Sequence, residues 1–133
     1  MSTAIDHTGS NFWRLWLGVT ALKKSLFFSL LFVIIVLSVI PHTSRFVSPY
    51  KSPWMASGYI QHALGYFLLS AVACHAFPKR RTWACLAGIL CLGIALELIQ
   101  YIIPTRTFNL YDILANALGI FPVMIKKIFK LRR

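Results

Sequence analysis

Acidic residues are scarce in this sequence. Only 3 of the 133 residues are aspartate or glutamate, against 14 lysines and arginines, and charged residues make up 13% of the chain. A soluble domain of this length needs a far more polar surface. The shortage of charge therefore argues against a soluble globular domain, and it singles out any carboxylate that lies inside an apolar segment.

Patterns for disulfides and metal sites are also missing. The cysteines Cys74, Cys85 and Cys91 show no CxxC spacing and fall in apolar segments, where free cysteine behaves as a small apolar residue. The 4 histidines are dispersed along the chain. We therefore expect neither a disulfide framework nor a metal centre, and no cofactor.

Apolar residues dominate the chain instead. Hydrophobic residues make up 58% of it, and the mean hydropathy is +0.69. Four apolar stretches approach or reach the ~20 residues that cross ~30 Å of hydrocarbon as a helix. They lack the alternation of barrel strands, and only helices or closed barrels satisfy the backbone in lipid. The sequence therefore predicts an all-α polytopic membrane protein with a single transmembrane domain.

Prolines and basic residues mark the ends of these stretches. Residues 1–24 are predicted to form a polar tail followed by a short interfacial helix. The four predicted transmembrane helices span about 25–40, 54–77, 82–103 and 109–125, and a basic tail, 126–133, follows. Pro122 is expected to kink the last helix. The first apolar run also resembles a signal peptide, but its length and the lack of a small-x-small cleavage pattern favour a retained helix.

The distribution of positive charge predicts the orientation. Of the 14 lysines and arginines, all except Arg45, Lys51 and Arg106 lie before the first predicted helix, in the 79–81 turn, or after the last helix. The positive-inside rule then places both termini in the cytoplasm, in an inner or plasma membrane. Basic residues clustered at helix ends favour contact with membrane lipids, and without a stacking motif they argue against nucleic acid.

Several polar side chains fall in the half of the membrane that faces outward in this topology. The candidate site residues are His62, Tyr66, Glu97, Gln100, Arg106, Asp112 and Asn116. At a rise of ~1.5 Å per residue, the two carboxylates, the asparagine and the histidine lie ~6 to ~12 Å inward from the outer loops. A carboxylate in hydrocarbon is costly unless it is paired, hydrogen-bonded or protonated. We therefore expect these side chains to form a buried cluster, with Arg106 above it.

The same residues resemble a family pattern. The segments Glu97-Leu-Ile-Gln100, Pro104-Thr-Arg106, Asp112-Ile-Leu-Ala-Asn116 and Gly119 are similar to the E-x-x-Q, P-x-R and D-x-x-x-N-x-x-G motifs of VanZ-like membrane proteins. His62-Ala-Leu-Gly-Tyr66 resembles the H-x-x-x-Y of that family, although Gly58 stands where the family often has aspartate. The similarity covers about residues 54–119.

The resemblance implies a small bacterial polytopic membrane protein that acts at the cell envelope. The family is named for a link to resistance against the glycopeptide teicoplanin. Its biochemical activity is not settled, so only the general envelope role is carried over to this chain.

Four interpretations of the cluster stay open. It can hold the helices together without further chemistry. It can bind or position an envelope component, such as a lipid-linked or cell-wall precursor, or a membrane partner; we favour this interpretation. A small proton-coupled transporter is the alternative, with Glu97 or Asp112 as the proton carrier. An intramembrane enzyme acting on lipid phosphates ranks last, because no serine or cysteine near the cluster has an obvious base partner.

Overall fold

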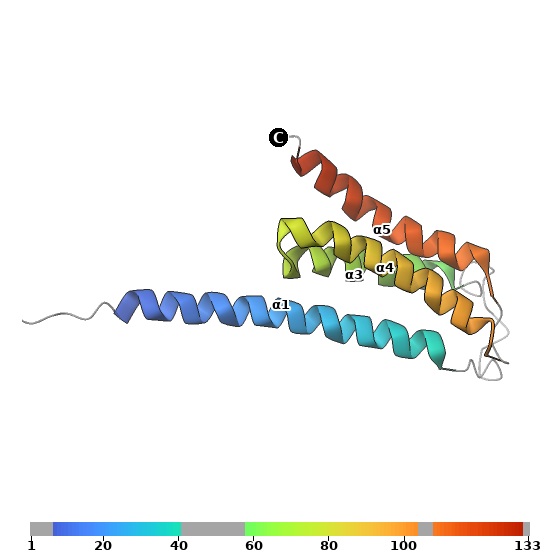
Figure 1. The fold of residues 1–133 in the computed structure, drawn as a ribbon, viewed down its shortest axis with the longest axis horizontal. Helices are drawn as coiled ribbons and strands as arrows, with labels where there is room; N and C mark the ends of the chain where they lie inside the picture. The colour runs from blue at the N-terminus through green and yellow to red at the C-terminus, as the bar shows by residue number, and fades with distance from the viewer. Residues whose placement is uncertain (1–6, 41–57, 104–107, 132–133) are drawn as a thin grey trace, which may run out of the picture.

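The computed structural model describes residues 7–40, 58–103 and 108–131. Within these ranges the chain forms only helices: α1 (His7–Val39), α3 (Tyr59–Ala76), α4 (Lys79–Gln100) and α5 (Leu110–Leu131), shown in Figure 1. The predicted all-α fold class is therefore confirmed. The loop that carries Arg106 lies outside the described residues.

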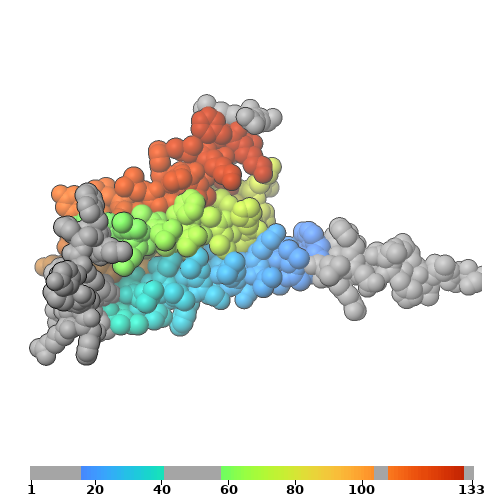
Figure 2. All heavy atoms as spheres, turned by 180° about the vertical axis from the view of Figure 1, so that it is seen from behind, coloured from blue at the N-terminus to red at the C-terminus, as the bar shows by residue number. Residues whose placement is uncertain are grey.

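The first helix is longer than the sequence suggested. α1 has 33 residues and runs without a break through the region where a separate interfacial helix was expected. The glycines within it are Gly9 and Gly18, and each costs about 1 kcal/mol relative to alanine, which is too little to end a long helix. At its N-terminal end α1 extends beyond the rest of the bundle (Figures 1 and 2).

Pro78 forms the junction between α3 and α4. α3 ends at Ala76, and Phe77 adopts an extended conformation because a residue before proline is pushed out of the helical region. Proline is well tolerated at a helix start, where its missing N–H has no partner to lose. The Thr82 hydroxyl donates to the Pro78 carbonyl at 3.1 Å. α4 therefore begins at Lys79 rather than at residue 82.

The last helix has a side-chain cap and continues past its proline. The Asn109 Oδ1 accepts a hydrogen bond from the Tyr111 N–H at 3.1 Å, which satisfies one of the free donors at the start of α5. α5 contains Pro122 and continues to Leu131, beyond the predicted end at residue 125. Most of the expected basic tail is therefore the last part of this helix.

α3 and α4 lie between α1 and α5 (Figure 1). The most extensive contact in the bundle joins α3 to α5. A Cβ atom at Gly119 would collide with the Ala63 carbonyl oxygen, so the backbones of α5 and α3 touch there. On the other side, the rings of Phe27 and Phe77 meet edge to face at 5.0 Å and join α1 to the end of α3.

Large apolar side chains cover much of the outer surface. The exposed ones include Phe28, Phe32, Leu37, Leu98, Leu114, Leu118 and Phe121. Soluble monomers rarely expose apolar surface on this scale. Within the described residues, two helical segments could cross a membrane by length and composition: Trp16–Val39 and Lys79–Gln100. These features suggest a membrane location.

Candidate functional site

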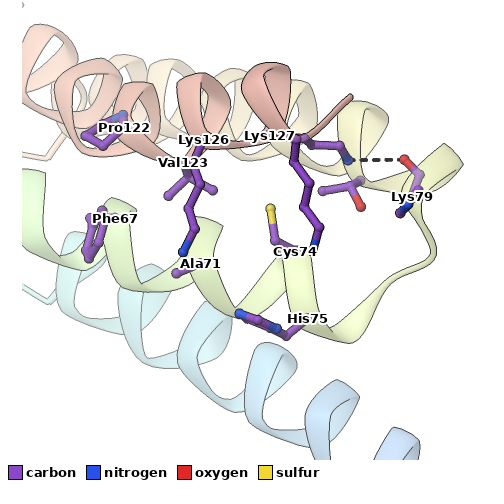
Figure 3. Close-up of a pocket in the computed structure, with 11 residues that line it drawn as sticks. Phe67, Ala71, Cys74, His75, Lys79, Pro122, Val123, Lys126 and Lys127 are labelled. Atoms are coloured by element: carbon purple, nitrogen blue, oxygen red, sulfur yellow. Dashed lines mark hydrogen bonds between the residues drawn. The ribbon is translucent and has the colours of Figure 1, made fainter. Parts of the chain in front are cut away.

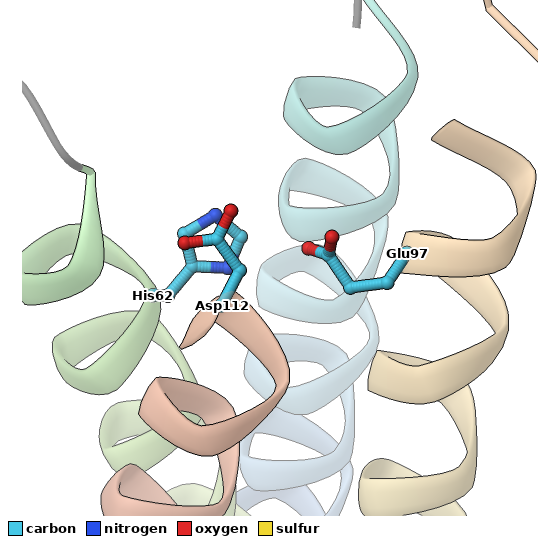
Figure 4. Close-up of side chains that lie close together, drawn as sticks. All are labelled: His62, Glu97 and Asp112. Carbon is cyan, nitrogen blue, oxygen red and sulfur yellow. The ribbon is translucent and has the colours of Figure 1, made fainter. Parts of the chain in front are cut away.

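Three helices bring polar side chains together at the end of the bundle where α3 and α5 begin and α4 ends. His62 lies in the first turn of α3, Glu97 in the last turn of α4, and Asp112 in the first turn of α5. One donor atom from each side chain lies within 4.8 Å of the other two. In Figure 4 the Glu97 carboxylate points toward the other two side chains. With Asn116, which contacts His62, these residues form what we call the polar cluster.

Helix starts place two of these side chains. Gly58 precedes α3 in a left-handed conformation, with φ 71°, which glycine adopts without strain. Its carbonyl accepts a hydrogen bond from the His62 N–H at 3.1 Å, so this glycine sets where the imidazole enters the bundle. Asp112 follows the cap residue Asn109, and the helix macrodipole favours a carboxylate in a first turn by ~0.3–1 kcal/mol.

Asn116 orients the histidine. The His62 Nδ1 lies 3.0 Å from the Asn116 Oδ1, and Asn116 is fully buried on α5. Because an amide oxygen can only accept, the Nδ1–H must be the donor. The Nε2 of a neutral His62 then keeps its lone pair for a proton, a metal ion or a ligand.

Gly93 has no side chain, and this leaves space for Tyr66 and Asn116 beside the cluster. A Cβ atom at this position would lie 3.1 Å from the Asn116 Nδ2 and 3.0 Å from the Tyr66 Cε1, both closer than ordinary van der Waals contact. Tyr66 is itself buried, with 3% of its surface exposed. The two side chains therefore pack directly on the backbone of α4, one helical turn from Glu97.

Gln100 is buried with Glu97 but makes a different contact. Its Nε2 donates a hydrogen bond to the Ser38 carbonyl at 3.0 Å, near the end of α1. The sequence predicted Gln100 as a member of the same buried cluster as Glu97, and the contact with Ser38 was not predicted. The glutamine thus links α4 to α1 beside the polar cluster.

A second set of contacts at this end, among Asn109, Tyr59 and Tyr111, was also not predicted from the sequence. The Asn109 Nδ2 donates to the Tyr59 hydroxyl at 3.3 Å, and the Tyr59 and Tyr111 rings lie 6.1 Å apart. The only available signal was Asn109 at the expected start of a helix. These contacts hold the first turns of α3 and α5 together, next to His62 and Asp112.

The side chains of the polar cluster can bind a metal ion, protons or a hydrogen-bonding ligand. One imidazole and two carboxylates are nitrogen and oxygen donors of the kind that bind divalent transition metals. The expectation of no metal centre rested on the dispersed histidines, yet this set needs only His62. The same atoms can also hold protons, or accept hydrogen bonds from hydroxyl and ammonium groups. No serine or cysteine is among the four residues of the cluster, so it contains no such nucleophile.

Comparisons with known proteins do not identify this geometry. No family model, no curated protein and no solved structure matches the chain. The resemblance to VanZ-like proteins therefore rests on the motif residues, of which the structure brings His62, Glu97, Asp112 and Asn116 together.

Proposed function

We propose that this chain is a four-span, VanZ-like protein of the inner or plasma membrane, with both termini in the cytoplasm. Its polar cluster would then face outward and bind or position a component of the cell envelope. The exposed apolar side chains of α1, α4 and α5 support contact with lipid. The 18 residues of α3 extend ~27 Å, close to the ~30 Å of hydrocarbon, and a local thinning of the bilayer can make up the difference.

The observation that carries the proposal is the meeting of the two carboxylates with His62. The chain has 3 acidic residues, and two of them lie within one site of an apolar bundle. Apolar residues of similar volume often hold helices together at least as well as buried charged groups do. Ionisable side chains inside a membrane therefore point to a binding or transport role.

The chemistry of the cluster indicates the kind of ligand. Carboxylate oxygens accept hydrogen bonds, so they suit a head group rich in hydroxyl, amide and ammonium donors. Lipid-linked cell-wall precursors carry sugars and peptides with such groups, and their lipid tail can lie against the apolar surface of the bundle. Arg106 is expected to meet the anionic part of the same head group.

The depth of the carboxylates favours binding over the transporter alternative. Glu97 lies in the last turn of α4 and Asp112 in the first turn of α5, so both are near helix ends. Coupling sites of transporters usually lie near the bilayer midplane. A site near the outer ends of the helices can hold a head group while the rest of the ligand stays in the outer leaflet.

The test measures binding of a polyprenyl-linked cell-wall precursor to the protein in nanodiscs. We expect Glu97→Gln and Asp112→Asn each to weaken binding by about tenfold or more, because hydrogen bonds to a charged group contribute ~1.5–3 kcal/mol. Asp6→Asn removes the same charge from the N-terminal tail and should leave binding unchanged. Equal binding by all variants would overturn the proposal, and so would failure of both cluster variants to accumulate as folded protein, which would show a structural role.

A further inference from the structure

A cavity of about 420 Å³ lies at the other end of the bundle from the polar cluster, lined by α3, α4 and α5 (Figure 3). Its lining falls into two parts. Phe67, Ala71, Pro122 and Val123 give it an apolar wall. Lys79, Lys126, Lys127 and Lys130, with His75, give it a basic rim. We call this cavity the basic hollow.

The hollow follows from how α5 packs on α3. Near Gly119 the two backbones touch, so α5 is held tightly against α3 at that level. Toward its C-terminus α5 diverges from α3 and α4 (Figure 1). Pro122, three residues after Gly119, lacks the N–H that would bond back along the helix. The space that opens between the helices is the hollow.

Positive charge gathers in this space with no balancing carboxylate among the described lining residues. The Lys127 Nζ is held in place, because it donates to the Lys79 carbonyl at 3.1 Å (Figure 3). It also lies 5.2 Å from the centre of the Trp83 ring. The side chains of Lys126 and Lys130 are exposed. Several ammonium groups around one cavity repel each other, and a bound anion relieves this repulsion.

We propose that the basic hollow binds the phosphate head group of an anionic phospholipid. The lysines would contact the phosphate, and the wall of Phe67, Ala71 and Val123 would contact the start of an acyl chain. A basic rim beside an apolar wall suits an amphiphile better than a free ion. In the topology proposed above, this end of the bundle faces the cytoplasmic leaflet, where anionic lipids attract lysine and arginine. The site is separate from the polar cluster and does not depend on what that cluster binds.

The experiment measures lipid binding to the purified full-length protein by native mass spectrometry. Phosphatidylglycerol and phosphatidylcholine with the same acyl chains are compared, with inorganic phosphate as a competitor. We expect phosphatidylglycerol to bind about tenfold more tightly than phosphatidylcholine, and millimolar phosphate to displace little of it. Equal binding of the two lipids would overturn the proposal. Full displacement by phosphate would also overturn it, since the hollow would then be a site for free phosphate.

Matched variants separate a defined site from general attraction between charges. Lys126→Gln with Lys130→Gln should lower the affinity for phosphatidylglycerol about tenfold and leave the fixed Lys127 in place. Lys23→Gln with Lys24→Gln is the control, because it removes the same charge from an exposed part of α1, one turn from Phe27 and so near the same end of the bundle. An equal loss in both double variants would contradict a defined site.

A third variant tests the cavity itself. Ala71→Phe keeps every lysine but fills the hollow, so it should abolish the preference for phosphatidylglycerol. Circular dichroism and the thermal midpoint will show whether this variant is folded. A folded Ala71→Phe protein that keeps the full preference would show that the lipid binds elsewhere.

Discussion

The contact between His62 and Asn116 is the most informative pair of side chains in the structure. It joins α3 to α5 at 3.0 Å, and its direction follows from the chemistry of the amide oxygen. With Nδ1 engaged, Nε2 is the nitrogen that can act toward Glu97, Asp112 or a ligand. The state of one imidazole therefore reports on the geometry of the whole polar cluster.

Replacing Asn116 with leucine should release this imidazole. We expect the nitrogen NMR signals of neutral His62 to show the Nδ1–H tautomer in the wild-type protein and a mixture of tautomers in Asn116→Leu. The loss of a buried hydrogen bond should also cost about 1–3 kcal/mol of stability. The exposed His75 is an internal control, whose signals should not change. A wild-type protein with mainly the Nε2–H tautomer would contradict the assignment.

The sequence predicted that Glu97 and Gln100 would be buried, but it did not predict which helix Gln100 contacts. Glu97 and Gln100 lie three positions apart, and both are buried, as residues on one face should be. The partner of Gln100 is Ser38 on α1, and that depends on how α1 is rotated against α4. Helical periodicity carries no information about this rotation between helices. Arg106, the remaining candidate, lies outside the described residues, so its place above the cluster stays a prediction.

At the scale of the helices, the close contact of α3 with α5 supports both sites. It holds together the helices that carry His62 and Asp112 at one end, and toward the other end α5 diverges to leave the basic hollow (Figure 1). Gly119 makes the contact possible because it has no side chain to hold the backbones apart. Adding a single methyl group at this position therefore tests whether α3 and α5 pack this closely.

Gly119→Ala should destabilise the protein by about 1–3 kcal/mol, because the added Cβ meets the backbone of Ala63, which cannot rotate away. Gly88→Ala is the matched control. A Cβ at Gly88 meets nothing within 4 Å, so this change should be neutral or stabilise α4 by roughly 0.5–1 kcal/mol. Thermal unfolding in detergent measures both. Similar midpoints for the two variants would show that α3 and α5 are farther apart in the native protein.

The last helix is longer than its local sequence predicted, because a proline near its end does not stop it. Pro122 lies near the predicted end of the last helix at residue 125, yet α5 continues to Leu131. The kink at Pro122 stays a prediction. Buried Val123 lies next to the proline, and Lys127 bonds to the Lys79 carbonyl one turn later, so contacts with other helices favour the continued helix. The single sequence showed the local cost of proline but not these compensating contacts.

At the scale of the whole molecule, charge is divided between the two ends of the bundle. The described carboxylates lie in the polar cluster at one end, and the lysines of α5 and the start of α4 lie at the other. This separation of charge does not stabilise the packing of the helices, because the opposite charges are too far apart to attract each other strongly through water. It does match a membrane protein with a fixed orientation, in which basic residues stay in the cytoplasm.

This orientation can be tested with single cysteines in a background that lacks Cys74, Cys85 and Cys91. We expect Phe108→Cys, an exposed position before α5, to react with a membrane-impermeant maleimide in intact spheroplasts. Arg80→Cys, exposed at the start of α4, should react only after the membrane is opened, because the basic end is kept inside by the positive-inside rule. The opposite labelling pattern would show that the protein has the inverted topology, in which the polar cluster faces the cytoplasm. In that case a ligand from the outer envelope could not reach Glu97 and Asp112, and the basic hollow would face the leaflet that lacks the anionic surface potential.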